Sequence, residues 1–274
     1  MPELPEVETI RRGIEPVIRG KRITAVHIFQ PCLRWPVDTK AMGKWVTGQT
    51  VTTVSRRSKY LILDLANDAA LVVHLGMSGR IGLYAPDDEP EKHTHLIFDV
   101  QGNIQLRYRD PRRFGYIDVV QPGALSTYKR FAALGPEPLS AEFNGDFLQQ
   151  KLSKSKRAIK TALLDMGVAA GVGNIYANEA LFVAGIDPRR LASDLREDEF
   201  AGLADAVKQV LSFAIKKGGT TLNDFRNATG EPGFFQLELA VYDRRDQPCL
   251  HCGTAIEKVV IGGRSTYFCP LCQG

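Results

Sequence analysis

The sequence ends in four cysteines whose spacing limits what this part of the chain can fold around. Cys249 and Cys252 form one Cys-x-x-Cys pair, and Cys269 and Cys272 form a second. Two such pairs, separated by a segment long enough for a hairpin, match a tetrahedral four-cysteine zinc site. A piece of about 30 residues cannot bury enough apolar surface to fold alone, so the metal must supply its folding energy. We therefore predict one structural Zn²⁺ held by Cys249, Cys252, Cys269 and Cys272.

The residues between the cysteine pairs indicate a β-hairpin. Ile256–Ile261 and Arg264–Phe268 are β-rich and flank Gly262-Gly263, a pair suited to a tight turn. His251 could in principle bind the metal, but four thiolates close a tetrahedral shell, and a closed shell makes the zinc structural. The hairpin could be scaffold alone. Arg264 favours a further role, because a side chain at the hairpin tip can reach a groove.

The first 130 residues begin with a helical pattern and continue as short strands. Apolar residues recur at helical spacing over residues 5–18, and Gly20 follows as a stop signal. Between residues 22 and 121, β-rich runs alternate with Gly, Asn, Asp and Pro, which predicts a sandwich or barrel. The predicted strands are Arg22–Phe29, Thr50–Ser55, Tyr60–Leu65, Leu71–Leu75, Leu96–Val100, Ile104–Tyr108 and Tyr116–Val120.

The second half of the chain is helical in pattern. Gly135–Pro138 is rich in Pro and Gly and marks a boundary. Residues 218–240 lack strong periodicity and contain several glycines, which predicts a long loop, and loops of that length tend to be functional. The predicted helices are Gly145–Lys151, Arg157–Asp165, Ile175–Val183 and Arg196–Lys216.

The composition is that of a globular chain with a modest basic excess. Hydrophobic residues make up 44%, charged residues 24%, and the formal net charge is +4. No uncharged apolar run reaches the roughly 18 residues of a membrane span, and acidic residues occupy the start of the chain instead of a secretory pattern. We therefore expect a cytoplasmic protein that does not enter a membrane.

The basic residues are clustered. Lys151, Lys154, Lys156, Arg157 and Lys160 fall in one short stretch without an acidic residue. Such clusters are typical of surfaces that contact a phosphate backbone, although a solvated face is the simpler alternative. A second cluster consists of Arg107, Arg109, Arg112 and Arg113.

The sequence begins Met1-Pro2-Glu3, an arrangement suited to amine chemistry. Removal of Met1 would leave Pro2 with a secondary α-amine, and α-amines titrate near pH ~8, so a fraction is unprotonated at neutral pH. Attack by this amine on a sugar C1′ gives an iminium cation, which serves as an electron sink for elimination. Glu3 could protonate the sugar ring oxygen as a general acid. The alternative is that these residues only cap a helix.

Several long motifs in order resemble the formamidopyrimidine-DNA glycosylase family. The likeness begins at Met1–Thr9, which carries Met-Pro-Glu-Leu-Pro-Glu-Val-Glu-Thr, and extends over essentially the whole chain. Together these motifs make a chance match negligible. The others are Arg56–Tyr60, His74–Gly79, Lys92-His93, Asp110–Gly115, Gly171–Tyr176, Gly218–Leu222 and the cysteine module.

The resemblance implies an α+β multidomain fold. Its parts would be an N-terminal catalytic β-sandwich with flanking helices at 1–130, a helix–two-turn–helix domain with a lesion-capping loop at 135–235, and a zinc β-hairpin finger at 240–274. It implies a bifunctional DNA glycosylase and AP lyase acting in base-excision repair on damaged double-stranded DNA. Such an enzyme removes 8-oxoguanine and formamidopyrimidines and then cuts by β- and δ-elimination. We expect it to be a monomer.

The resemblance also implies the catalytic roles. Pro2 matches the family's Schiff-base nucleophile, and Glu3 matches its proton donor. Lys59 matches a lysine that binds a lesion-strand phosphate and is credited with proton donation in β-elimination. Arg264 matches the finger arginine linked to DNA phosphate and δ-elimination.

The remaining motifs match DNA contacts. Met77, Arg112 and Phe114 resemble three residues that fill the space left by an everted base, a step such enzymes need. A phenylalanine on a loop is otherwise more often packed into the hydrophobic core. Asn174 follows Gly171–Gly173 at a helix start, where backbone amides suit a phosphate. The further implied DNA contacts are His93, Arg113, Lys154 and Lys156.

Two other functions compete with this one. The sister enzyme endonuclease VIII prefers oxidised pyrimidines, and the loop from Thr220 to Phe235, which varies in the family, bears on that choice. A non-catalytic damaged-DNA-binding protein would lack the nucleophile, whereas Pro2 and Glu3 are present. Two local departures from the family pattern are Thr161, often proline, and Asp243, often glycine.

Overall fold

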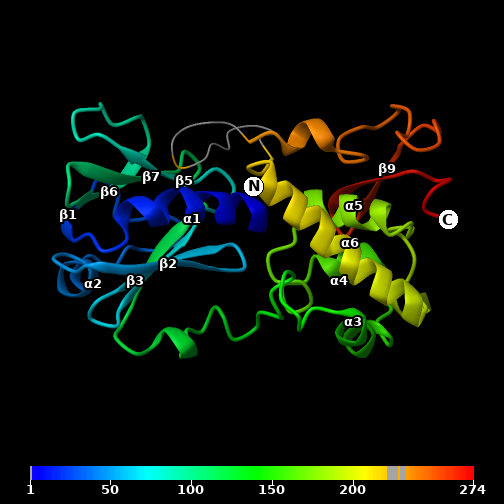
Figure 1. Ribbon diagram of the computed structural model, residues 1–274, viewed down its shortest axis with the longest axis horizontal. Helices are drawn as coiled ribbons and strands as arrows, with labels where there is room; N and C mark the ends of the chain where they lie inside the picture. The colour runs from blue at the N-terminus through cyan, green and yellow to red at the C-terminus, as the bar shows by residue number, and fades with distance from the viewer. Residues whose placement is uncertain (1, 221–227, 229–232) are drawn as a thin grey trace. The chain divides into compact units, whose positions relative to one another are not determined.

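The structure, a computed structural model, describes residues 2–220, 228 and 233–274 (Figure 1). The chain forms two compact units. Unit 1 comprises Met1–Ala132 and Lys217–Phe234, and unit 2 comprises Ala133–Lys216 and Phe235–Gly274.

Unit 1 combines one long helix with two antiparallel four-stranded sheets. The sheets have the strand orders β1-β6-β7-β5 and β2-β3-β4-β8. Helix α1 (Leu4–Ile18) packs against β2, β3 and β5, so it contacts both sheets (Figure 1). The other elements are β1 (Ile23–Ile28), α2 (Thr39–Trp45), β2 (Val51–Arg57), β3 (Tyr60–Leu65), β4 (Ala70–His74), β5 (Arg80–Tyr84), β6 (Thr94–Val100), β7 (Ile104–Arg109), β8 (Tyr116–Val120) and the 3₁₀ turn η1 (Leu125–Thr127).

One apolar core joins α1 to both sheets. Ile10 and Ile14 of α1 are buried in the same apolar cluster as Phe98 of the first sheet and Leu63 and Leu71 of the second. Burying a side chain of this size stabilises the fold by about 1.5–3 kcal/mol. The shared core confirms the predicted β-sandwich and places the first turn of α1 on a rigid support.

Two elements of unit 1 were not apparent in the sequence pattern. Strand β5 contains Gly82, and its Leu83 amide donates to the Ala228 carbonyl at 2.9 Å, a distant partner that no local pattern reveals. Helix α2 has Gly43 in its interior, and it begins where the Asp38 side chain accepts the Ala41 amide at 2.9 Å. The seven predicted strands and the first helix are present, with ends shifted by at most a few residues.

Unit 2 contains the four predicted helices and the finger. None of the described helices is long and apolar enough to cross a membrane. The hairpin β9–β10 turns at Gly262 and Gly263, which both have positive φ. The elements are α3 (Gly145–Leu152), α4 (Ile159–Leu163), α5 (Asn174–Val183), η2 (Ala192–Asp194), α6 (Glu197–Lys216), η3 (Phe235–Glu238), β9 (Glu257–Ile261) and β10 (Arg264–Phe268).

Buried polar side chains on α5 fix the finger to the helices. The Glu179 carboxylate is 3% exposed and accepts the amides of Ala240, Val241 and Tyr242 at 2.8–3.0 Å. Burial raises the pKa of Glu179, and these three amides oppose that shift by stabilising the charge. The next residue towards the N-terminus, Asn178, accepts the Tyr267 amide of β10 at 2.8 Å. The segment entering the finger is therefore tied to α5 by backbone donors.

The two departures from the family pattern, Asp243 and Thr161, both lie in or beside the finger. Asp243 has a φ of +59°, a conformation that glycine adopts at lower cost, and its Oδ1 accepts the Tyr267 hydroxyl at 3.1 Å. Thr161 lies beside the finger turn, where its Oγ1 is 3.1 Å from an ideal Cβ position on Gly262. Neither residue disturbs the elements around it.

Replacing Glu179 by Gln should lower the free energy of unfolding by about 2–3 kcal/mol, because an amide NH₂ would face a backbone N–H in a buried site. Urea unfolding of the zinc-loaded protein measures the change. Glu142→Gln, at an exposed position, should change stability by less than about 0.5 kcal/mol. Equal effects of the two substitutions would contradict the anchoring role of Glu179.

Candidate functional site

The start of α1 holds Pro2 and Glu3 in a defined position. Glu3 is the N-cap residue of α1 and is 2% exposed, and Glu6 completes a capping box with it. The Glu6 Oε2 atom accepts the Glu3 amide at 2.8 Å. The helix-capping alternative is therefore true of Glu3, and it fixes the backbone that carries Pro2.

Glu6 also binds the segment that leads into the lesion-capping loop. Its carboxylate is 2% exposed, and its Oε1 accepts the Thr220 amide at 2.8 Å. The preceding Gly219 has a φ of +81°, and a Cβ there would lie 3.0 Å from Glu6 Oε1. Glu6 is not among the predicted catalytic or DNA-binding residues. Residues 221–227 and 229–232, most of the predicted lesion-capping loop, lie outside the described residues.

Lys59 lies at the turn of the β2–β3 hairpin and is 7% exposed. Its neighbour Ser58 has a φ of +57°, and the Ser58 carbonyl accepts Arg56 Nη1 at 2.8 Å. Arg56 also forms an ion pair of 3.3 Å with Glu8 on α1. Burial raises the pKa of Glu8, but hydrogen bonds from Arg11 and Arg12 together with the charges of Arg11 and Arg56 outweigh burial and lower the pKa overall. Lys59 is thus supported by the helix that carries Pro2 and Glu3.

Two loops of unit 1 present to solvent the residues predicted to fill the space left by an everted base. Met77, Arg112 and Phe114 are called the wedge residues below. Met77, on the turn between β4 and β5, is 43% exposed, and Phe114, between β7 and β8, is 42% exposed. The Arg112 guanidinium lies over the Phe114 ring at 4.6 Å. The alternative, that Phe114 is buried in the core, is therefore wrong. Arg113 and His93 are also exposed, and both have positive φ, at 53° and 72°.

His74, at the end of β4, has an internal hydrogen-bond partner. Its Nδ1 accepts the Gly76 amide at 3.1 Å, and its ring stacks on Tyr116. Burial, reinforced by the charges of Lys59 and Arg34, lowers the pKa of His74 to about 4. The neutral ring can accept this hydrogen bond at pH 7, and it orders the turn that carries Met77.

Two of the clustered basic residues are not surface charges. Arg107 is 3% exposed and donates to the carbonyls of Ala85 and Asp88 at 3.0 and 2.7 Å. Lys160 is fully buried. Both residues sit in sequence clusters that suggest a phosphate-binding surface, and for these two members that interpretation is wrong. A run of like charges in sequence does not reveal which side chain points inward.

Lys160 instead supports the finger in unit 2. Its Nζ donates to the Ser265 carbonyl at 2.8 Å and to the Thr266 hydroxyl at 2.7 Å. Asn174, at the start of α5, donates from Nδ2 to the same Ser265 carbonyl at 3.0 Å. Both residues therefore fix the backbone next to Arg264, which is exposed. The predicted contacts Lys154 and Lys156 are also exposed, in the segment between α3 and α4.

The four finger cysteines form a cluster suited to zinc. Their sulfur atoms all lie within 4.8 Å of one another. The Cys249–Cys272 and Cys252–Cys269 sulfurs are 3.9 and 3.4 Å apart. Tetrahedral zinc with bonds of about 2.3 Å separates its sulfur ligands by about 3.8 Å, so the cluster fits. Structural Zn²⁺ at this site agrees with the prediction.

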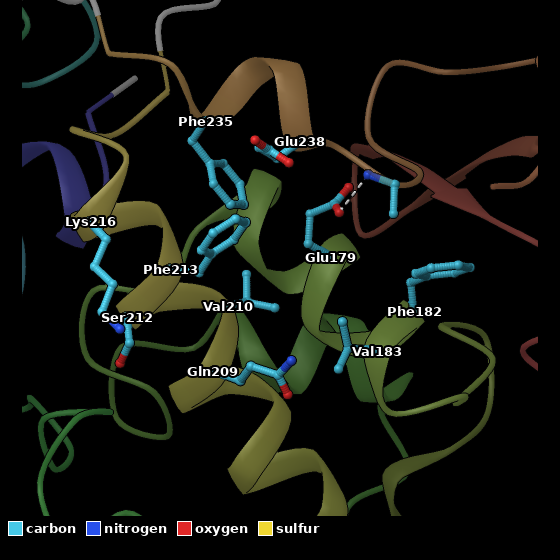
Figure 2. Close-up of a pocket in the computed structure, with 11 residues that line it drawn as sticks. Glu179, Phe182, Val183, Gln209, Val210, Ser212, Phe213, Lys216, Phe235 and Glu238 are labelled. Carbon is cyan, nitrogen blue, oxygen red and sulfur yellow. Dashed lines mark hydrogen bonds between the residues drawn. The ribbon is translucent and has the colours of Figure 1, made fainter. Parts of the chain in front are cut away.

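A pocket of about 540 Å³ lies elsewhere in unit 2 (Figure 2). Figure 2 shows Phe213 and Phe235 side by side at its wall, with their ring centroids 5.9 Å apart. Glu179 lines it too, but its carboxylate is engaged with backbone amides. None of the predicted catalytic or DNA-binding residues lines this pocket.

Replacing Cys269 by Ser should abolish zinc binding, because one thiolate of the tetrahedral set is lost. We expect metal analysis to find one zinc ion per wild-type chain. Cys32→Ser is the matched control, since Cys32 is exposed and lies outside the cluster. A Cys269→Ser protein that keeps its zinc would rule out this ligand set.

Comparison with known proteins places the whole chain in one family. Residues 1–117 match the formamidopyrimidine-DNA glycosylase N-terminal domain, residues 134–226 match its H2TH domain, and residues 246–274 match a zinc finger found in FPG and IleRS. The chain is 48% identical over 273 residues to formamidopyrimidine-DNA glycosylase of Laribacter hongkongensis and 47% identical over 275 residues to that of Hahella chejuensis. Each match covers 100% of both chains.

Solved structures give the same result. The MutM (Fpg) protein of Thermus thermophilus superposes with a TM-score of 0.88 at 41% identity, covering 100% of this chain and 99% of that one. The Fpg of Lactococcus lactis, in a complex with abasic-site DNA, superposes with a TM-score of 0.91 at 37% identity, covering 99% of each chain. The chain therefore belongs to the formamidopyrimidine-DNA glycosylase family.

Proposed function

We propose that this glycosylase and AP lyase excises oxidised purines from duplex DNA with the amine of Pro2 as its nucleophile, after Met1 is removed. The observation that carries this assignment is Glu3, a carboxyl group that is 2% exposed and directly follows Pro2. The capping hydrogen bond from Glu3 to Glu6 keeps this acid and the amine in a fixed relation. Relatives in solved complexes with Fapy-dG or abasic-site DNA support damaged DNA as the substrate.

The proposed chemistry has two stages, which are release of the base with opening of the sugar and then two eliminations that cut the strand. The Pro2 nitrogen attacks C1′, the bond from C1′ to the base breaks, and the departing base takes up the proton that the Pro2 nitrogen loses. Glu3 donates a proton to the ring oxygen, so the sugar opens and its C1′ becomes an iminium carbon bonded to Pro2. Loss of a proton from C2′ then expels the 3′ phosphate. A second elimination expels the 5′ phosphate.

Lys59 and Arg264 would assist the eliminations. We assign Lys59 to a lesion-strand phosphate and to proton donation in the β-elimination. Its position on a rigid hairpin turn suits a residue that must hold a phosphate in place. Arg264 would bind phosphate during the δ-elimination, because it stands exposed at the finger turn while Lys160 and Asn174 hold the adjoining Ser265.

Base eversion would rely on the two exposed loops of unit 1. Met77 and Phe114 are large apolar residues that leave 43% and 42% of their surface exposed in the free protein. Insertion into the duplex would fill the space left by the everted base, with Arg112 beside Phe114. The exposed His93, Arg113, Lys154 and Lys156, together with Asn174, would contact the DNA backbone.

We keep the three-part division proposed from the sequence, at 1–130, 135–235 and 240–274. The third part requires its zinc ion, and the protein would act as a cytoplasmic monomer on DNA. The full-length relatives reported above are formamidopyrimidine-DNA glycosylases, which argues against both competing functions.

Replacing Glu3 by Gln should slow base excision at least ~100-fold, because the proton donor is lost. Cutting at a preformed abasic site should fall by less than ~10-fold, since no base remains to be released. Single-turnover assays on 8-oxoguanine and abasic-site duplexes separate the two steps, and Glu89→Gln, at an exposed position, is the control. Equal loss of both steps would contradict the role assigned to Glu3.

Replacing Lys154 or Lys156 by Ala should weaken DNA binding and reduce the salt dependence of the association constant. Each lost phosphate contact removes about one unit from the slope of log K against log salt. Lys40→Ala removes an exposed lysine from α2 and should leave the slope unchanged. An unchanged slope after Lys154→Ala and Lys156→Ala would mean that both are ordinary surface charges.

A further inference from the structure

The two wedge loops of unit 1 meet at one buried side chain. Asp110, the first residue after β7, is 0% exposed although its loop extends into solvent. Its Oδ1 accepts the Ser78 hydroxyl at 2.6 Å, and Ser78 lies directly after Met77. Its Oδ2 accepts the Gly115 amide at 2.8 Å, and Gly115 lies directly after Phe114. One carboxyl group thus binds the immediate neighbour of each apolar wedge residue.

Ser78 also binds the backbone of Arg112, the third wedge residue. Its Oγ accepts the Arg112 amide at 3.3 Å while its hydroxyl donates to Asp110. The order Asp110–Ser78–Arg112 links the β4–β5 turn to the β7–β8 loop by side chain and backbone. A further donor, the Tyr108 hydroxyl, reaches Asp110 Oδ2 at 3.3 Å from within the core. Each carboxyl oxygen therefore has a donor in a site that excludes water.

The backbone of Asp110 is fixed as firmly as its side chain. Its carbonyl accepts a hydrogen bond from His95 Nε2 at 2.8 Å; a carbonyl can only accept, so this nitrogen carries the proton. The Asp110 amide donates to the His93 carbonyl at 3.1 Å. Asp110 is therefore anchored to β6 and to the residue just before it, and it cannot follow the loop if the loop moves.

The two loops also touch without any side chain between them. A Cβ on Gly76 would lie 2.4 Å from the Gly115 nitrogen and 2.4 Å from the Phe114 carbonyl carbon. A Cβ on Gly115 would lie 2.5 Å from the His74 carbonyl oxygen. Real Cβ contacts do not reach such distances, so this approach of two backbones requires glycine on both loops.

The geometry points to Asp110 as the positioning residue for base eversion. It holds Met77, Arg112 and Phe114 as one preformed wedge, so that inserting them costs little ordering entropy when the base leaves the stack. Asp110 touches neither the DNA nor the reacting atoms. This inference rests on the wedge role proposed above for the three exposed residues.

The consequence is a selective effect on intact lesions. An 8-oxoguanine paired with cytosine must be unpaired and unstacked before excision, whereas an abasic site has no base to evert. Loosening the wedge should therefore slow excision of the paired lesion and spare cutting at a preformed abasic site. A general loss of folding would lower both rates together.

The test uses Ser78→Ala and Asp110→Asn in the zinc-loaded full chain. Ser78→Ala removes the link to Arg112 and leaves the Asp110–Gly115 bond intact. Asp110→Asn places its one amide NH₂ either against the Gly115 amide, which can only donate, or against the Ser78 hydroxyl, which would then have to accept instead of donate. We expect each to slow single-turnover excision from an 8-oxoguanine–cytosine duplex about tenfold. Cutting of abasic-site DNA should change less than about twofold.

Two further variants complete the design. Ser78→Thr retains the hydroxyl and should restore most of the excision rate, and Ser126→Ala, at an exposed position, should match the wild type. Fluorescence of 2-aminopurine placed opposite the lesion should rise more slowly on mixing with Ser78→Ala than with wild type. If Asp110→Asn fails to fold, Ser78→Ala and its threonine rescue still decide the outcome.

The outcomes separate the two proposals. Equal losses on both DNA substrates, or no loss with Ser78→Ala, would overturn the positioning role of Asp110. A wild-type protein unable to excise 8-oxoguanine or to cut abasic-site DNA would instead overturn the proposed function. A selective loss that threonine rescues, with slower 2-aminopurine response, supports the role of Asp110.

Discussion

The candidate active site depends most on the two hydrogen bonds that the buried carboxylate of Glu6 accepts from backbone amides. Within unit 1 this carboxylate accepts the amide of Glu3 on one oxygen and the amide of Thr220 on the other. A buried carboxylate left without donors would cost several kcal/mol, so both amides are held strongly. The first turn of α1 is thereby fixed at the position where the amine of Pro2 and the carboxyl of Glu3 must cooperate. The segment that leads to the lesion-capping loop is fixed by the same group.

The same arrangement recurs at three other places in the described residues. Asp110 lies under the wedge loops, Glu179 under the entry to the finger, and Lys160 under the backbone beside Arg264. Each is a buried polar group bound mainly to backbone or hydroxyl partners, and Asp110 and Lys160 support backbone next to residues that are exposed. Because a buried polar group is costly to leave unpaired, it locks a loop more firmly than surface contacts do. Rigid support of this kind suits a protein that must unstack a base.

The sequence predicted the features that have local causes. The cysteine spacing predicted the zinc site, and the helical period over residues 5–18 predicted α1. It failed where the partner comes from a distant segment. The role of Asp110 depends on Ser78, and β5 forms by pairing with β7 and also binds Ala228, connections that no local pattern reveals. The clusters of basic residues predicted surface positions for Arg107 and Lys160, and this was wrong because tertiary packing decides which side chains are buried.

The most direct test of the central claim locates the covalent bond between protein and DNA. Borohydride reduces the iminium formed on 8-oxoguanine DNA, and digestion after Arg11 followed by mass spectrometry identifies the modified peptide. The account predicts an adduct on the peptide of residues 2–11, carried by the amine of Pro2. An adduct on a lysine such as Lys59, or full activity in protein that retains Met1, would contradict it.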